Sequence, residues 1–360
     1  MQISNRMLTT ILFLASLQVV DFQLVAATAA YDLVVVDADT NLPIKGVNVV
    51  GWFSNSNGWK AWTESAPEYE DKKITDENGL CHLAGETNNG RTGVNIHYPP
   101  NGYYPNSFCV RHQFTQKPLL PLMHWRPTDL VITAKLQRVG HTVPLFVKRM
   151  GRKLGSDAIA ANGESFAYDL VKGDFMPPFG DGNIADIAFS CLSPEYIGEG
   201  KNSRGKEAPR YKNAVVVTFQ GDAENGILES PAPDAQAYCW IRSAPERGYH
   251  REVSFSEATS SDLQRREGLD SKKCYCFRIR TERDEGGKIK SSIYGKLYGD
   301  PIFILEGNDR WKQKIGGISF VYYLNPTPND RNLEWDRKNN FCDKPGNLEK
   351  IVNHNPTLIP

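Results

Sequence analysis

The sequence predicts a mostly β protein with two domains. Short apolar segments recur along the chain and are separated by clusters of Gly, Pro, Asp and Asn, which is typical of strands joined by turns. The 360 residues include 30 Gly and 22 Pro. Between residues 31 and 138 no segment has the 3.6-residue apolar period of an amphipathic helix. A chain of this length is expected to form about two ordinary domains.

The first thirty residues have the pattern of an export signal. Arg6 supplies a positive charge, residues 7–20 form an apolar run, and Ala27, Thr28 and Ala29 are small residues where cleavage would occur. The apolar run is shorter than the roughly 20 residues of a membrane-spanning helix, and Asp21 interrupts it. We therefore expect residues 1–30 to be removed, leaving a secreted or periplasmic chain with no stable membrane span. An uncleaved anchor is the alternative.

The charge balance argues against several classes of partner. Forty-two basic and 42 acidic residues cancel, and no basic stripe runs along the chain, so nucleic-acid binding is not predicted. The seven histidines are scattered singly, and no Cys-x-x-Cys pair is present. We therefore predict no metal site and no cofactor.

Residues 31–138 have the pattern of an all-β domain. Strands are expected over residues 31–36, 47–51, 80–83, 93–98 and 129–138, where apolar residues run together or alternate. A turn is expected over residues 75–79, with Gly79 at a position that needs a positive φ.

Several short motifs in this domain resemble those of a known protein family. Residues 36–40, 43–49 and 75–80 resemble the carboxypeptidase regulatory-like family, and residues 94–96 and 102–104 are similar to its final strand and Gly-Tyr turn. The resemblance covers residues 31–138, less than a third of the chain. It implies a seven-stranded, Ig-like or transthyretin-like β-sandwich with a structural, spacer or adhesive role. In a related adhesin branch a lysine forms an internal crosslink, but here Val35 stands at that position, so no crosslink is expected.

Residues 139–360 are predicted to form a second, antiparallel β-rich domain with one or two short helices. A helix is expected over residues 256–267, because Ser256 suits an N-cap and Arg265 and Arg266 suit the C-terminal end. The closing segment, residues 322–334, resembles hypothetical secreted proteins of unassigned function. The expected strands are residues 185–191, 214–219, 237–241, 274–280, 289–298 and 315–324.

Seven cysteines allow at most three disulfides. We expect Cys81 and Cys109 to be bridged, because both belong to the first domain and flank a strand that returns on itself. Such a bridge would contribute about 3–4 kcal/mol through the unfolded state. Free, buried thiols are the alternative. Cys274 and Cys276 would lie on the same side of one strand and are poorly placed to bridge each other.

Two acidic turns contain oxygen ligands that could bind a cation. Asp37, Asp39 and Asn41 have the opening spacing of a calcium loop, but Leu42 and Asn48 stand where such a loop has Gly and Glu. An ordinary turn is therefore favoured there.

The second acidic turn holds Asp181, Asn183 and Asp186, whose oxygens could surround a cation. A Gly-rich turn that enters a strand is favoured there as well. No Gly-x-Ser-x-Gly, Ser-x-x-Lys or His-Glu zinc-protease motif is present.

The clearest functional hint is an aromatic segment over residues 52–62. Trp59 and Trp62, flanked by Ser, Asn and Gly, could form a platform for a sugar ring or an apolar patch of a partner. The favoured alternative is that both rings fold back onto the domain.

Two functions follow from these patterns. The first is a secreted non-catalytic binding or structural protein, with carbohydrate or cell-envelope material as ligand. The alternative is a secreted hydrolase or processing enzyme with its active site in residues 139–360. A cluster of three or more ionisable groups at the bottom of a cleft in that domain would favour the enzyme, whereas a flat, exposed aromatic strip without such a cluster would favour binding.

Overall fold

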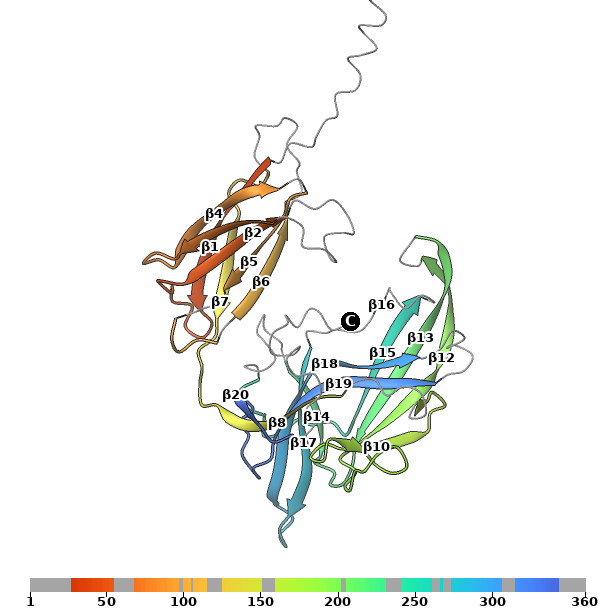
Figure 1. Ribbon diagram of the computed structural model, residues 1–360. Coiled ribbons are helices and arrows are strands. Elements are labelled where there is room, and N and C mark those ends of the chain that lie inside the picture. Colours follow the sequence, from red (N-terminus) through yellow and green to blue (C-terminus); the bar gives the residue numbers. More distant parts are fainter. Residues whose placement is uncertain are drawn as a thin grey trace, which may run out of the picture. The chain divides into compact units, whose positions relative to one another are not determined.

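The computed structural model describes residues 27–54, 68–87, 89–96, 100–104, 106–114, 125–150, 159–201, 205–230, 241–260, 266–267, 273–305 and 315–342. The prediction of a mostly β chain is confirmed, since these residues form strands β1 to β20 and no helix (Figure 1). It follows that no helix in this part of the chain could span a membrane. The chain divides into two compact units, unit 1 within residues 1–136 and unit 2 within residues 137–360.

Unit 1 contains two sheets. A three-stranded sheet has the order β4-β1-β7, and a four-stranded sheet has the order β3-β2-β5-β6. β1 pairs with β7 in parallel, whereas the other neighbours are antiparallel. The strands are β1 Ala27–Asp37, β2 Asn48–Ser54, β3 Glu68–Ile74, β4 Leu80–Thr87, β5 Arg91–Ile96, β6 Asn106–Gln113 and β7 Val131–Leu136.

The two sheets of unit 1 share one core. Alternate residues of β1, such as Leu33 and Val35, point inward and are fully buried, and they form one apolar cluster with Val49 and Phe53 of the facing sheet. Tyr31 of β1 donates a hydrogen bond to the carbonyl of Gly93 on β5, at 3.0 Å, and so joins the sheets directly. Unit 1 is therefore a β-sandwich of three strands on four.

Residues 27–30, which the sequence pattern assigns to the export signal, form the start of β1. They pair with residues 84–87 of β4, and Ala27 and Ala29 lie in the core. We expect a chain that begins at Tyr31 to be less stable than one that begins at Ala27 by about 1–3 kcal/mol, because buried apolar surface and ladder hydrogen bonds are lost. Urea unfolding of the two chains measures this difference, and equal midpoints would contradict it.

Unit 2 contains a six-stranded sheet of order β11-β10-β12-β13-β15-β16 and a seven-stranded sheet of order β14-β17-β18-β19-β8-β20, in which β9 also pairs with β19. The pairing is antiparallel except between β8 and β20. The strands are β8 Val143–Met150, β9 Ile159–Ala160, β10 Ser165–Asp169, β11 Asp174–Phe175, β12 Ile187–Lys201, β13 Glu207–Phe219, β14 Gly226–Ser230, β15 Glu252–Ser260, β16 Arg266–Glu267, β17 Cys274–Arg283, β18 Ile289–Leu305, β19 Ile315–Asn325 and β20 Trp335–Asn340.

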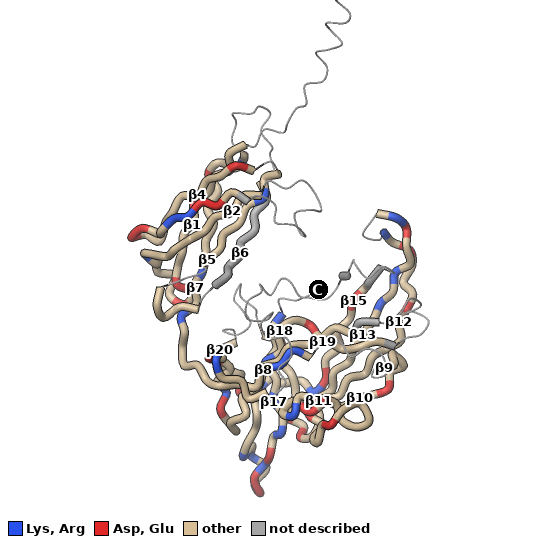
Figure 2. Tube along the Cα trace, viewed as in Figure 1, with Lys and Arg blue, Asp and Glu red and all other residues tan. Residues whose placement is uncertain are grey.

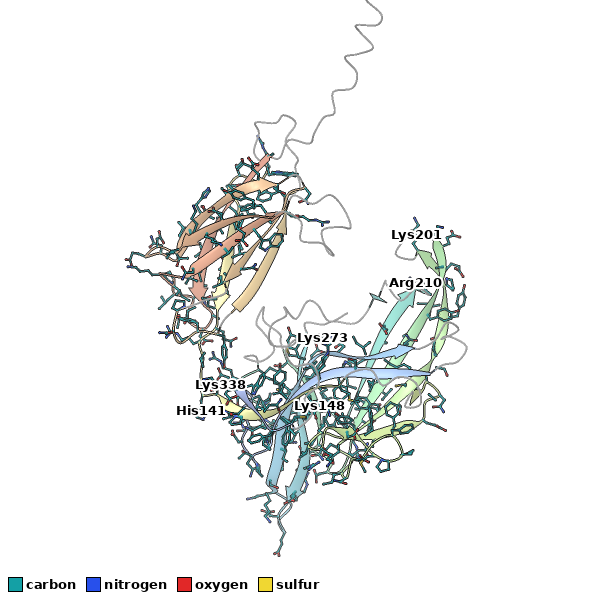
Figure 3. The ribbon with its side chains drawn as sticks, in the orientation of Figure 1. His141, Lys148, Lys201, Arg210, Lys273 and Lys338 are labelled. Carbon is teal, nitrogen blue, oxygen red and sulfur yellow. The ribbon has the colours of Figure 1, made fainter. Side chains whose placement is uncertain are left out.

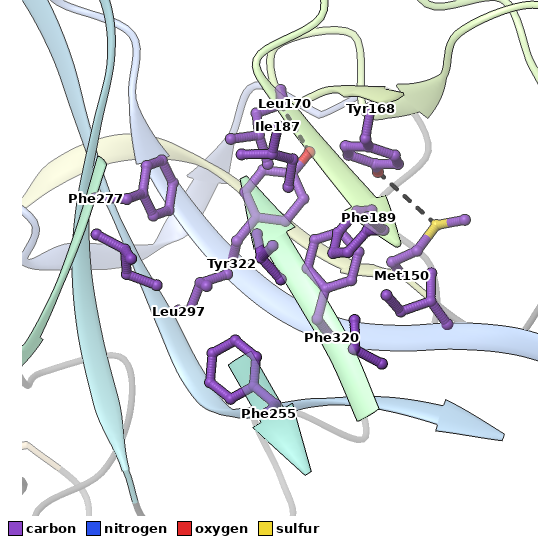
Figure 4. Close-up of a cluster of buried hydrophobic side chains, with 14 of the residues drawn as sticks. Met150, Tyr168, Leu170, Ile187, Phe189, Phe255, Phe277, Leu297, Phe320 and Tyr322 are labelled. Atoms are coloured by element: carbon purple, nitrogen blue, oxygen red, sulfur yellow. Dashed lines mark hydrogen bonds between the residues drawn. The ribbon is translucent and has the colours of Figure 1, made fainter. Parts of the chain in front are cut away.

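The core of unit 2 lies between these sheets and is rich in aromatic rings (Figure 4). Phe189 of the six-stranded sheet packs against Phe320 of the seven-stranded sheet, with ring centroids 5.2 Å apart. The buried hydroxyl groups of Tyr322 and Tyr168 find partners, as aromatic residues with a polar end require. Tyr322 donates to the carbonyl of Leu170 at 2.7 Å, and Tyr168 donates to the Met150 sulfur at 3.8 Å.

The helix predicted over residues 256–267 is wrong. Residues 252–260 form β15 and residues 266–267 form β16. Phe255 and Glu257 are buried whereas Ser254 and Ser256 are exposed, which is the two-residue period of a strand. Pairing of β15 with β13 overrides the weak capping pattern on which the helix prediction depended. Of the strand predicted over residues 237–241, Ile241 lies outside any strand and the other positions lie outside the described residues.

Candidate functional site

The first acidic turn uses its carboxylate within unit 1. One oxygen of the buried Asp37 accepts hydrogen bonds from the backbone N–H groups of Asp39 and Thr40, at 3.0 and 2.9 Å. The other oxygen accepts the Tyr103 hydroxyl at 2.9 Å. These contacts make an Asx-type turn, as favoured from the sequence. Within the described ranges, no group of three or more His, Cys, Asp or Glu side chains is placed to hold a metal ion.

The second acidic turn leads to a buried ion cluster in unit 2. Asp186 accepts hydrogen bonds from the Nε and Nη2 atoms of Arg280 at 2.8 and 2.9 Å, and Asp169 accepts from Nη2 at 2.8 Å. The carboxyl group of Asp169 also accepts the backbone N–H groups of Asn183 and Ile184. We call Asp169, Asp186 and Arg280 the carboxylate clamp.

The carboxylate clamp joins the two sheets of unit 2. Asp169 ends β10 and Asp186 directly precedes β12, both in the six-stranded sheet, whereas Arg280 lies on β17 of the seven-stranded sheet. The two carboxyl side chains are 3% and 1% exposed and the Arg280 side chain 24%. Arg280 has a φ of 50°, an uncommon left-handed backbone for a residue of this size. The hydrogen bonds from its guanidinium to Asp169 and Asp186 hold the Arg280 side chain in position.

The electrostatics of the carboxylate clamp fit a structural role. Burial alone would raise the pKa of Asp169, but hydrogen bonds from the backbone N–H groups of Lys172, Ile184 and Asn183, together with the charge of Arg280, lower it. Burial raises the pKa of Asp186, and Arg280 opposes that rise. Each carboxylate oxygen of the clamp accepts at least one hydrogen bond from Arg280 or the backbone, as expected of a buried structural ion cluster.

A different surface is formed where β12 and β13 continue past the core as a hairpin. We call residues 192–201 of β12 and 207–214 of β13 the arm. Leu192, Tyr196 and Ile197 are 42%, 55% and 42% exposed on it. Figure 1 shows the arm rising beyond the other labelled strands of unit 2, and Figure 3 labels Lys201 and Arg210 on its two strands. The arm thus carries exposed apolar side chains that do not build the core.

One face of the arm continues the core face of the six-stranded sheet. Val215 of β13 is in the core, and strand alternation places Asn213 and Tyr211 on the same face. Glu257 of β15 is directly opposite Asn213, and Tyr196 of β12 is directly opposite Tyr211. We call this surface the tyrosine face.

Contacts within the tyrosine face hold its rings in place. The rings of Tyr196 and Tyr211 meet edge to face, with centroids 5.9 Å apart and an interplanar angle of 66°. The Tyr196 hydroxyl donates to Oε1 of Glu199 at 2.8 Å, and this hydrogen bond raises the pKa of Tyr196. At the inner end of the face, Asn213 is 4% exposed, and its Oδ1 accepts no hydrogen bond from the described residues.

The register of β12 explains why the sequence did not reveal this face. The pairing with β13 shifts between Leu192 and Glu195 and again between Tyr196 and Gly198. Such bulges change which side chains share a face. Because of these shifts, Tyr196 lies opposite Tyr211, a pairing that alternation along β12 alone would not reveal.

The ligand residues proposed from the sequence are not placed by the structure. Trp59 and Trp62 lie outside the described residues. Trp52, at the start of that aromatic segment, is half-buried on β2. The prediction that Trp59 and Trp62 bind a ligand therefore stays a prediction.

The predicted disulfide is not supported. Cys81 is a free, buried thiol, and its burial, with the nearby charges of Asp71 and Asp32, raises its pKa to about 11. Cys109 belongs to β6, and its side chain lies outside the described residues. β4 and β6 are edge strands at opposite ends of the sandwich, since β4 packs beside β3 and β6 beside β7. This topology separates the two cysteines, which the sequence could not show.

Charge does not single out any one surface of the chain. Figure 2 shows acidic and basic residues interspersed in both units. Where they are close they pair, as in the exposed contact of Arg283 with Asp222 at 2.7 Å. The expectation that nucleic acid is not a partner stays a prediction.

No family model and no curated protein matches the chain. Among solved structures, it is similar to the Bacillus anthracis TIE protein at 12% identity, with a TM-score of 0.23 and coverage of 54% of this chain and 29% of that one. It is also similar to BcpA, the major pilin subunit of Bacillus cereus, at 12% identity, with a TM-score of 0.22 and coverage of 82% and 68%. A DUF3823 family protein from Parabacteroides merdae matches at 9% identity and a TM-score of 0.21, with coverage of 82% and 98%.

These likenesses are too low in TM-score to assign a fold family or a function. The chain spans 29% of the TIE protein's length and 58% of that of a streptococcal ancillary pilin. The resemblance of residues 31–138 to the carboxypeptidase regulatory-like family therefore stays a prediction.

Proposed function

We propose that the chain is a non-catalytic binding or structural protein that acts outside the cytoplasm, as a secreted or periplasmic protein, with the arm as its contact surface. The observation that supports this proposal is the exposed surface of the arm. Its strands continue past the core and expose Leu192, Tyr196 and Ile197 on a paired, hydrogen-bonded hairpin. Exposed large apolar side chains on an ordered element that extends beyond the core are typical of interaction sites.

The carboxylate clamp supports a non-catalytic reading over the hydrolase alternative. It is a cluster of three ionisable groups in unit 2, the kind of cluster that an enzyme in residues 139–360 would use. Asp169 and Asp186 direct their oxygens to Arg280 and to backbone N–H groups, which stabilises the contact between the sheets. In this proposal, unit 1 is the carboxypeptidase regulatory-like sandwich and serves as a spacer, and the ligand is carbohydrate or cell-envelope material.

Removing the arm tests the proposal. Glu195 and Lys212 are cross-strand partners, so Asn-Gly in place of residues 196–211 closes a two-residue hairpin between them. We expect the chain to co-sediment with isolated cell envelopes of its native host, and the shortened chain to lose at least ten-fold in binding. Circular dichroism should show both chains folded.

A matched control changes another exposed hairpin end. Glu285→Ala with Lys288→Ala alters the turn between β17 and β18, which lies at the end of a different strand pair. This variant should sediment with envelopes as the unchanged chain does. The proposal is overturned if the shortened chain sediments equally well, or if the unchanged chain does not sediment at all.

A further inference from the structure

We infer that the tyrosine face binds the pyranose ring of a neutral saccharide, with Tyr196 as the stacking surface. This inference rests on the proposed function, because it names the ligand class of the arm. A saccharide ring offers a face of C–H groups that packs on an aromatic ring, and hydroxyl groups that need acceptors nearby. The tyrosine face has both features.

The ring of Tyr196 is exposed yet held in one orientation. Its side chain is 55% exposed, so a ligand can reach it. Tyr211 supports the ring edge to face, and the hydroxyl is fixed by its hydrogen bond to Glu199 at 2.8 Å. A ring restrained at both ends loses little conformational freedom when a ligand packs on it, which favours binding.

The polar groups of the tyrosine face suit a neutral ligand with hydroxyl groups. Glu199 is exposed beside Tyr196, and its carboxylate accepts hydrogen bonds. Glu207 is exposed further out on the same face, opposite Lys201, whereas Glu257 is buried nearer the core. The exposed Glu199 and Glu207 outnumber Lys201 on this face, which disfavours an anionic ligand, since bringing like charges together raises the energy of the complex.

The opposite face of the arm has a different character. Leu192 is paired with Ala214, which alternates with Asn213 and so lies on the other face of the sheet. Arg210 lies there too, because it is four residues before Ala214 on β13 and so points to the same side of the strand. The exposed aliphatic Leu192 and the cationic Arg210 therefore lie on the face that points away from Tyr196. Rings with acceptor oxygens, rather than aliphatic side chains, therefore characterise the tyrosine face, which favours a saccharide over a second protein chain.

The test uses a printed array of neutral hexose and N-acetylhexosamine oligosaccharides beside sialylated and uronic-acid oligosaccharides. The strongest neutral oligosaccharide is then titrated by calorimetry against the full chain and three variants. We expect Tyr196→Ala to weaken binding at least ten-fold. Tyr196→Phe keeps the ring and should bind within about three-fold, and Arg210→Ala, on the opposite face, should bind unchanged. Thermal unfolding of each variant confirms that it is folded.

Several results would overturn the inference. These are no binding to any neutral oligosaccharide, binding confined to the anionic ones, or Tyr196→Ala binding as tightly as the unchanged chain. A dimer in light scattering that Tyr196→Ala converts to a monomer, without saccharide binding, would assign the face to self-association instead. If the shortened chain loses envelope binding but Tyr196→Ala retains it, the saccharide inference fails and the proposed function stands.

Discussion

Replacing Arg280 with methionine is expected to destabilise the folded chain by about 3–5 kcal/mol, because it leaves Asp169 and Asp186 as buried carboxylates without their charged partner. Methionine keeps much of the arginine side-chain volume, so the loss of stability reflects the missing charge more than a change in packing. The free energy of unfolding from urea titration at pH 8 measures it.

The pH dependence of this loss separates charge from packing. Burial already raises the pKa of Asp186, and removing Arg280 removes the interaction that opposes the rise. A carboxyl group whose folded pKa is raised contributes full stability below its unfolded pKa of about 3.9 and loses it as the pH rises through the folded value. The deficit of Arg280→Met should therefore shrink as the pH is lowered from 8 towards 4.

An exposed arginine provides the control for Arg280→Met. Arg283 pairs with Asp222 at the surface, where solvent screens the attraction. Arg283→Met should cost much less than Arg280→Met, with little change in the loss between pH 8 and pH 4. Equal losses for the two variants, or a loss at Arg280 that does not depend on pH, would contradict the role given to the carboxylate clamp.

Replacing Gly295 with alanine is expected to destabilise the chain by about 1–3 kcal/mol. Gly295 lies on β18 opposite Phe277 of β17 and Leu324 of β19. An added Cβ would fall onto the Phe277 ring and lie 2.6 Å from the Tyr323 carbonyl oxygen. Phe277 is fully buried and the carbonyl belongs to a paired strand, so neither can move freely. Thermal or urea unfolding measures the loss.

Gly286 is the matched glycine for this experiment. It lies in the turn between β17 and β18, and an added Cβ there would approach nothing closer than 3.4 Å. Gly286→Ala should leave the stability unchanged or raise it slightly, because alanine restricts the unfolded chain. If Gly295→Ala were as stable as Gly286→Ala, the packing of Phe277 over β18 would be wrong.

The sequence predicts strands best where one face of a strand meets a core. The strand expected over residues 31–36 lies within β1, where buried residues mostly alternate, and that over residues 274–280 lies within β17, where buried residues run together. The strand expected over residues 185–191 forms only the first part of β12, which continues to Lys201. Residues 192–201 meet no core, so they carry no apolar pattern that would predict a strand.

The candidate sites depend on pairing between distant residues, which the sequence does not reveal. The turn that holds Asp186 has the composition of a cation site, but the partner of Asp186 is Arg280, 94 positions away in the chain. No local motif marks Asp169, although it completes the carboxylate clamp. Tyr196 lies beside Tyr211 only because of bulges in β12. Local patterns predict elements, whereas register and sheet order determine which side chains meet.

The parallel pairing of β1 with β7 has a mechanical consequence. These strands run side by side from the pair Asp32 and Val131 to the pair Asp37 and Leu136. Because they are parallel, a pull on the start of β1 and the end of β7 acts along the strands and in opposite directions. Such a force loads the hydrogen bonds between them together, in shear, instead of opening them one after another. Tension carried through unit 1 would therefore meet the resistance of the whole ladder at once.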